Sequence, residues 1–318
     1  MFTVIELYRS GVRHGIKVDP RGEEEVTKGL KRVEQEYNEM KEEEKGEFDI
    51  ERLTNPYGDT RILYGEPDRV VEHVIVGVDM EIGEVLLTER LIAKGQKIDL
   101  IIAHHPEGSA LAGFYDVMHL QADFLNKHGV PINVAEGILK ERISEVERRV
   151  LPINHQRAVD AARLFDIPFM CFHTPCDNMV TDFLQKRIDE DTPRTIKDTI
   201  KLLKNIPEYR QGFQQGAGPK IVAGSPDNRA GKIIVEMTGG TEGSKKAMGE
   251  FSRAGVGTII GMHFSDDLKK EAEKNHVNLI VAGHIPSDNI GLNLMMDKLT
   301  AEHKLDIVAC SGFKRIER

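Results

Sequence analysis

Short apolar runs rich in β-branched residues alternate with longer segments of helical period from Val70 to Leu299. This alternation is typical of α/β proteins, in which helices cover sheets that contain parallel strands. We predict strands at residues 70–79, 99–105, 167–173, 220–224, 232–240, 257–263 and 278–284, with 130–137 either a strand or the lead into a helix. We predict helices at residues 83–95, 114–129, 139–165, 194–205, 244–255, 265–276 and 287–299, the third divided at Pro152.

The alternation is interrupted between residues 181 and 218, where Pro193, Pro207 and a glycine-rich stretch break the pattern. We therefore expect two α/β lobes, one at residues 61–180 and one at residues 181–318. The runs DLIIAHH and NLIVAGH lie one in each lobe and share a terminal histidine. This likeness indicates related βαβ units, the alternative being chance similarity between two buried strands.

Residues 1–60 precede this pattern and form a charged helical N-terminal extension in our prediction. Residues 22–47 are crowded with charged residues and strong helix formers, and Val26, Leu30 and Val33 follow one another along a helical face. Such a segment is either a solvated surface helix or a contact with another subunit.

The composition excludes several classes of protein. The formal net charge is −9, which disfavours direct nucleic-acid binding. Three cysteines are too few for a disulfide framework and fit a reducing compartment. No apolar run approaches the roughly 18 residues of a transmembrane helix, and no long apolar run lies near Met1. We expect a cytoplasmic protein without a membrane partner.

Histidines close four of the predicted strands. The strand at 99–105 ends on His104 and His105, and the strands at 167–173, 257–263 and 278–284 end on His173, His263 and His284. Ligands of α/β proteins collect beyond the carboxyl ends of the strands. One such histidine is usually a hydrogen-bonded structural residue, whereas several beside carboxylates indicate a metal site.

The adjacent pair sharpens this interpretation. Successive side chains of a strand point to opposite faces, and Pro106 favours an extended backbone at His105. Two adjacent histidines therefore favour a cluster of two ions over a single ion.

Two carboxylates follow the strand-end histidines. Asp177 is expected in the loop after residues 167–173, and Asp288 in the first turn of a helix capped by Ser287. Asp288 is either a ligand or a partner of the helix dipole. Imidazole with carboxylate suits divalent Zn, Fe, Mn, Co or Ni and does not select among them.

Three motifs in this order resemble the Nif-three-like family, whose members are often labelled GTP cyclohydrolase I type 2 homologues. They are His-His-Pro at 104–106, His-Thr-x-x-Asp at 173–177 and Gly-His-x-x-Ser-acid at 283–288. The resemblance runs from about Asn55 to Leu299 and includes a strand ending at Asp79.

The resemblance implies a Nif-three-like fold with a dinuclear metal centre between the lobes, in a ring-shaped homohexamer. The implied ligands of the two ions are His104, His105, Asp177, His284 and Asp288. Two positions depart from the family pattern, because Asp288 stands where Glu is usual and Pro175 stands where Asn is usual.

Two ions that hold water and substrate oxygens are suited to hydrolysis. We therefore predict a metal-dependent hydrolase of a small phosphorylated or nucleotide-like substrate; the family label implies opening of the guanine ring of GTP. The alternative is a non-catalytic metal-binding protein, or a ring-shaped scaffold for a protein partner.

Three further features stay open at this point. The turn at 238–244, with Gly239, Gly240 and Gly243, is either a tight turn or a weak anion site before a helix. His173 and His263 are candidates for acid–base catalysis, or they support the metal ligands.

Overall fold

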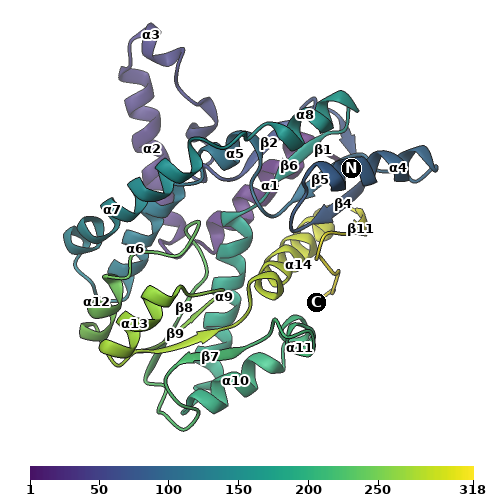
Figure 1. The fold of residues 1–318 in the computed structure, drawn as a ribbon. Helices are drawn as coiled ribbons and strands as arrows, with labels where there is room; N and C mark the ends of the chain where they lie inside the picture. Colours follow the sequence, from purple (N-terminus) through teal and green to yellow (C-terminus); the bar gives the residue numbers. More distant parts are fainter.

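Two sheets with helices packed around them form the protein, as seen in the computed structural model, which describes residues 1–318 (Figure 1). The first sheet has the strand order β11 (Asp306–Ala309), β4 (His73–Gly77), β5 (Leu100–Ala103), β6 (Phe169–Cys171) and β2 (Arg61–Tyr64). The first four are parallel, and β2 is antiparallel to β6. The predicted α/β fold class is confirmed.

The second sheet has the order β7 (Lys220–Ala223), β10 (Asn278–Val281), β9 (Val256–Gly261) and β8 (Lys232–Glu236). Here β8, β9 and β10 are parallel, and β7 is antiparallel to β10. A small antiparallel pair joins β1 (Phe2–Thr3) to β3 (Val70–Val71). Central strands such as β5 are buried along their whole length, which explains their continuous apolar runs.

The helices surround both sheets. Those before β6 are α1 (Val4–Lys17), α2 (Glu23–Glu39), α3 (Glu42–Lys45), α4 (Ile82–Ala93), α5 (Gly108–Ala112), α6 (Leu120–Lys127), α7 (Ile132–Val150) and α8 (Arg157–Leu164), with short 3₁₀ helices at Ile50–Leu53 and Asp116–His119. Those after β6 are α9 (Thr174–Asp191), α10 (Ile196–Lys204), α11 (Pro207–Gln214), α12 (Ala247–Arg253), α13 (Asp266–Lys274) and α14 (His284–Glu302). None of them combines the length and apolar character that crossing a membrane requires.

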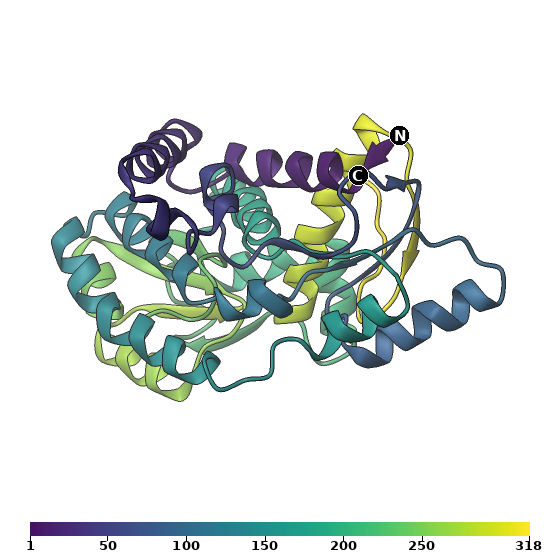
Figure 2. The same ribbon diagram turned by 90° about the horizontal axis from the view of Figure 1, so that it is seen from above.

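Helices α9 and α14 pack against each other and join the cores of the two sheets. On α9, Met179 belongs to the core beside the first sheet and Leu184 to the core beside the second. On α14, Met295 and Ile290 divide in the same way. Figure 2 shows α14 lying between the two sheets. Side chains near the start of these two helices are therefore held where the cores of the two sheets meet.

The first sixty residues contain two different parts. Helices α2 and α3 project from the body, whereas α1 lies against the first sheet and α9 (Figure 1). Two glycines of α1 permit this contact, because a Cβ on Gly11 would clash with the Phe172 ring and a Cβ on Gly15 would lie 2.6 Å from Pro175 Cβ. Helix α1 thus supports the chain on both sides of His173.

Residues 132–137 begin α7, which confirms the alternative that residues 130–137 lead into a helix and excludes the strand. Two local predictions were wrong. Asp177 lies in the first turn of α9, because this helix starts at Thr174 directly after β6. Ser287 does not cap α14; Gly283 does, with φ of 114°, and the Ser287 hydroxyl donates to the Gly283 carbonyl oxygen inside the first turn, at 2.5 Å.

Candidate metal centre

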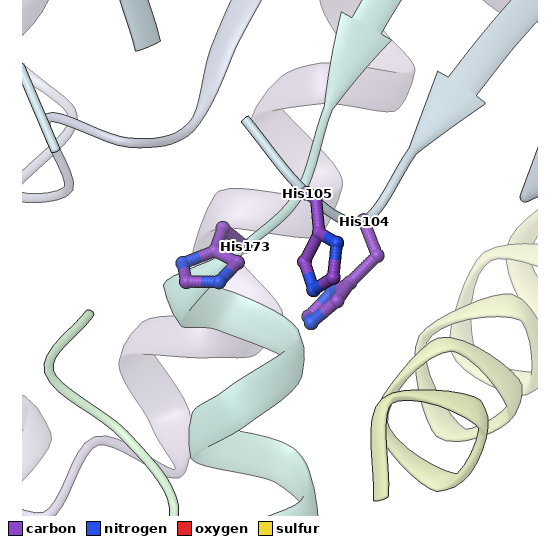
Figure 3. A group of neighbouring side chains, drawn as sticks. All are labelled: His104, His105 and His173. Carbon is purple, nitrogen blue, oxygen red and sulfur yellow. The ribbon is translucent and has the colours of Figure 1, made fainter. Parts of the chain in front are cut away.

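Three histidines meet where β5 and β6 end. These strands are parallel neighbours, with Ala103 opposite Cys171, so the residues that follow them emerge at one edge of the sheet. The ring centroid of His104 lies 5.2 Å from that of His105 and 4.9 Å from that of His173. Figure 3 shows the three rings gathered between the ends of these strands and the start of α9.

Two carboxylates complete the cluster from α9 and α14. His104 Nε2 lies 3.4 Å from Asp177 Oδ1 and 3.5 Å from Asp288 Oδ1. The other oxygen of Asp288 lies 3.5 Å from His105 Nε2 and 3.6 Å from His284 Nε2. The Asp288 carboxylate therefore faces three histidines, one through Oδ1 and two through Oδ2.

Three overlapping groups of side chains have the spacing that can hold a metal ion. The first, which we name the buried group, is His104, Asp177 and Asp288. The second, the open group, is His105, His284 and Asp288. The third contains His104, His105 and His173. The buried and open groups share Asp288, so one carboxylate can serve two neighbouring ions.

The donor atoms fit metal ions better than they fit one another. His104 Nε2, Asp177 Oδ1 and both oxygens of Asp288 are buried and have no hydrogen-bond partner. Buried polar atoms without partners are destabilising, by about 1–3 kcal/mol each. Two ligands bound at about 2.1 Å to one tetrahedral ion lie about 3.4 Å apart, close to the separations here. The His and Asp side chains of this chain can thus bind metal.

Partners behind the histidines orient their rings. His104 Nδ1 donates to the Phe172 carbonyl oxygen at 3.1 Å, and His105 Nδ1 donates to Asp79 Oδ1 at 2.6 Å. Each bond fixes the tautomer and turns Nε2 toward the centre, as the outer partners of metal-binding histidines do. Asp79 ends the predicted strand 70–79, so its position at a strand end was the signal for this role.

A second carboxylate holds His173. Asp59 is fully buried, and its Oδ2 accepts hydrogen bonds from His173 Nδ1 at 2.7 Å and from the Thr174 hydroxyl at 2.6 Å. His173 Nε2 is left without a partner in the chain and belongs to the side of the ring near His104 and His105. Asp59 was missed in the sequence, because it lies in a loop between predicted elements and carries no motif.

Opposite charges decide the ionisation of this cluster. Burial opposes ionisation of Asp288, but His104, His105 and His284 together outweigh it and lower the pKa of the carboxyl well below its usual range. Burial lowers the pKa of His105, whereas hydrogen bonding to Asp288 and Asp79 raises it to a net value of about 9. For His284, burial is the larger effect and lowers the pKa.

The remaining predicted site residues lie at or beyond the edge of the cluster. His263 follows β9, and its ring centroid is 5.2 Å from that of His284. Gly239, Gly240 and Gly243 belong to the turn after β8; the first two have φ of 83° and 85°. Two carboxylates, Glu236 and Glu242, line the same pocket as this turn. The anion site therefore stays a prediction, with negative charge beside it.

No protein-family model and no curated protein matches this chain. Among solved structures, a NIF3 superfamily protein from Sphaerobacter thermophilus is similar at 28% identity and a TM-score of 0.69, over 80% of this chain and 91% of that one. Reduced HcgD from Methanocaldococcus jannaschii matches at 16% identity and a TM-score of 0.48, over 85% of this chain and 97% of that one. The first match agrees with the three histidine motifs and confirms the Nif-three-like resemblance: the chain has the fold of the NIF3 superfamily.

Proposed function

We propose that the protein is a hydrolase that uses two divalent transition-metal ions and acts on a small phosphorylated or nucleotide-like substrate. The ligands in this proposal are His104, His105, Asp177, His284 and Asp288. The observation that carries it is the set of buried, unpartnered donor atoms around Asp288, which require a partner that the chain does not supply. When bound, such ions lower the pKa of water and stabilise negative charge on substrate oxygens.

Three side chains of the protein have separate roles in this proposal. Asp288 faces the buried group through Oδ1 and the open group through Oδ2, so it sets the distance between them. His173 is held by Asp59 with Nε2 unpartnered, which suits it to carry a proton at that nitrogen. His263 is half-exposed beside His284 and is a second candidate for proton transfer on the solvent side.

Partial exposure of the open group supports a hydrolase over a non-catalytic metal-binding protein. The His284 side chain is 42% exposed and that of His105 is 26% exposed, so a substrate oxygen has access to this side of the centre. A closed site would favour the alternative, a non-catalytic metal-binding protein or scaffold. The resemblance also supports a ring-shaped homohexamer, which the mass of the native particle in solution tests. The sparse cysteines support a cytoplasmic location.

Elemental analysis of the purified full chain, without added metal, tests the ligand assignment. We expect two transition-metal ions per chain, and none in a variant that combines Asp177→Ala with His284→Ala. Absence of metal in both proteins, even after reloading, would overturn the assignment. A screen of phosphorylated and nucleotide-like substrates with the loaded protein then separates the hydrolase from the scaffold, because only the hydrolase turns over.

A further inference from the structure

A second pocket adjoins the candidate metal centre. It is lined by the turn after β8, by Gln121 of α6 and by residues that follow β9. His263 is one of the lining residues, and its ring contacts the His284 ring of the open group. A molecule in this pocket would therefore lie beside the open side of the metal centre.

The charged groups of the pocket are acidic. Glu236 lies at the end of β8 and makes no side-chain hydrogen bond or ion pair within the chain, and no lysine or arginine lines the pocket. Glu242 accepts a hydrogen bond from the Ser265 amide through Oε2 at 2.9 Å, which leaves Oε1 free. The nearby Lys245 and Lys246 pair instead with Asp267 and Glu141. His263 Nδ1 lies 3.9 Å from Glu242 Oε2, whereas no basic side chain pairs with Glu236. The Glu236 carboxylate is therefore not neutralised by an ion pair within the chain.

A buried amide oxygen points to a ligand independently of these charges. Gln121 is 3% exposed, and its Nε2 donates to the carbonyl oxygens of Gly239 at 2.8 Å and Thr241 at 2.6 Å. These two bonds fix the orientation of the amide, and Oε1 is left buried without a partner. An unpartnered buried acceptor is costly, so a hydrogen-bond donor from outside the chain is expected here.

Glycine at position 243 keeps the space between these acceptors open. A Cβ at this position would lie 2.7 Å from Gln121 Oε1 and 3.8 Å from Glu236 Oε1. Both oxygens therefore border one small space that any other residue would partly fill. A planar group with several N–H donors can satisfy an amide oxygen and a carboxylate together.

We propose that this pocket binds a small organic cation, of the guanidinium, amidinium or alkylammonium class, through Gln121 Oε1 and the Glu236 carboxylate. Met248, Met262 and Phe264 supply apolar surface for the carbon atoms of the ligand. As a binding site the proposal stands on the pocket alone. As the recognition site for a cationic group of the substrate, it rests on the proposed function.

The ionisation of Glu236 adds a pH dependence. Burial, followed by the charge of Glu242, raises the pKa of Glu236 to about 7. A cation binds the ionised carboxylate more strongly than the neutral acid. The affinity is therefore expected to rise with pH through 7, which a purely apolar site would not show.

Calorimetric titration of the full chain with methylguanidinium chloride tests the proposal, with N-methylurea as a neutral probe of similar shape. We expect saturable binding of one methylguanidinium per chain, and binding of N-methylurea at least about tenfold weaker. Glu236→Gln should weaken methylguanidinium binding by about tenfold or more, whereas Glu273→Gln, the same change on the exposed surface of α13, should not. Equal binding of both probes, or an unaltered affinity in Glu236→Gln, would overturn the proposal.

A steric variant tests the same space without a change of charge. Gly243→Ala should reduce the affinity by about tenfold, and Gly137→Ala, on an open face of α7, should leave it unaltered. Thermal melting of each variant shows that it is folded. His284→Ala should keep methylguanidinium binding while it loses the ion of the open group, so failure of the metal assignment and failure of this proposal are distinguishable. Unaltered binding in a folded Gly243→Ala variant would place the ligand elsewhere.

Discussion

The buried group and the open group share one carboxylate but differ in their access to solvent. His104, Asp177 and Asp288 are 1%, 2% and 0% exposed. In the open group, the side chains of His105 and His284 are 26% and 42% exposed. The partners of the histidine rings differ as well, because His104 and His105 each make a hydrogen bond through Nδ1, whereas the His284 side chain makes none.

For the two ions of the proposed centre, this difference implies separate roles. Electrostatic attraction is stronger where water is excluded, so an ion in the buried group would be held tightly and would exchange slowly. An ion in the open group would be held less tightly and would be accessible to a ligand from solution. We infer that, in the proposed centre, the buried ion would organise the site and the open ion would meet the substrate.

Removing the shared carboxylate should have the largest effect. Asp288→Asn keeps the size of the side chain but removes the charge that faces His104, His105 and His284. We expect the loss of both ions, measured by elemental analysis. Asp182→Asn, on the outer part of α9 where Asp182 pairs with Lys186, is the control and should retain them. Full metal content in Asp288→Asn would contradict the sharing of Asp288.

Single histidine variants should separate the two groups. Treatment with a chelator should remove metal from the native protein in two phases that differ in rate by about tenfold or more. His284→Ala should eliminate the fast phase, and His104→Ala the slow one, each leaving about one ion per chain. Metal release is followed with a colorimetric indicator. A single phase in the native protein would show that the two groups do not differ in this way.

Changing a residue that orients a ligand of the open group should have a smaller effect. Asp79→Asn weakens the hydrogen bond that orients His105 but leaves every ligand in place. We expect about a tenfold loss of affinity at the open group and none at the buried group, since outer partners contribute about 10–100-fold. Competition with an indicator of known affinity measures both. Equal losses at both groups would indicate a general destabilisation of the fold.

Local patterns in the sequence predicted much of the fold. The apolar runs at β4, β5, β6, β9 and β10 were recognisable because parallel strands are buried on both faces. The starts of two helices were predicted wrongly. At α9 and α14 the helix begins directly at the strand-end motif, so the loop expected for Asp177 and the cap expected at Ser287 do not exist. Pairing of β11 with β4 depends on tertiary contacts that no local signal reports.

The site was predictable to the extent that its residues lie at strand ends. Two neighbouring parallel strands are followed by His104, His105 and His173. Their positions at the strand ends were enough to predict that they lie close together. Asp59 could not be found in this way, because it reaches His173 from a loop over a separation of 114 residues. Gln121 was also missed, since its role depends on the carbonyl groups of a distant turn.

The smallest expected effect concerns the metal-free protein and pH. His105 has its pKa raised from 6.5 to about 9 by Asp288 and Asp79 against burial, so the folded state retains a proton that the unfolded state loses. This stabilisation is fully present below about pH 6.5 and is lost as pH rises through 9. We expect the melting temperature of the metal-free protein to fall by roughly 2 °C over this range, as for about 1 kcal/mol. The metal-loaded protein should not show this fall, because bound metal displaces the proton from His105 and its affinity increases with pH. Differential scanning calorimetry of both forms measures it, and an equal fall in both would show that His105 is not a ligand.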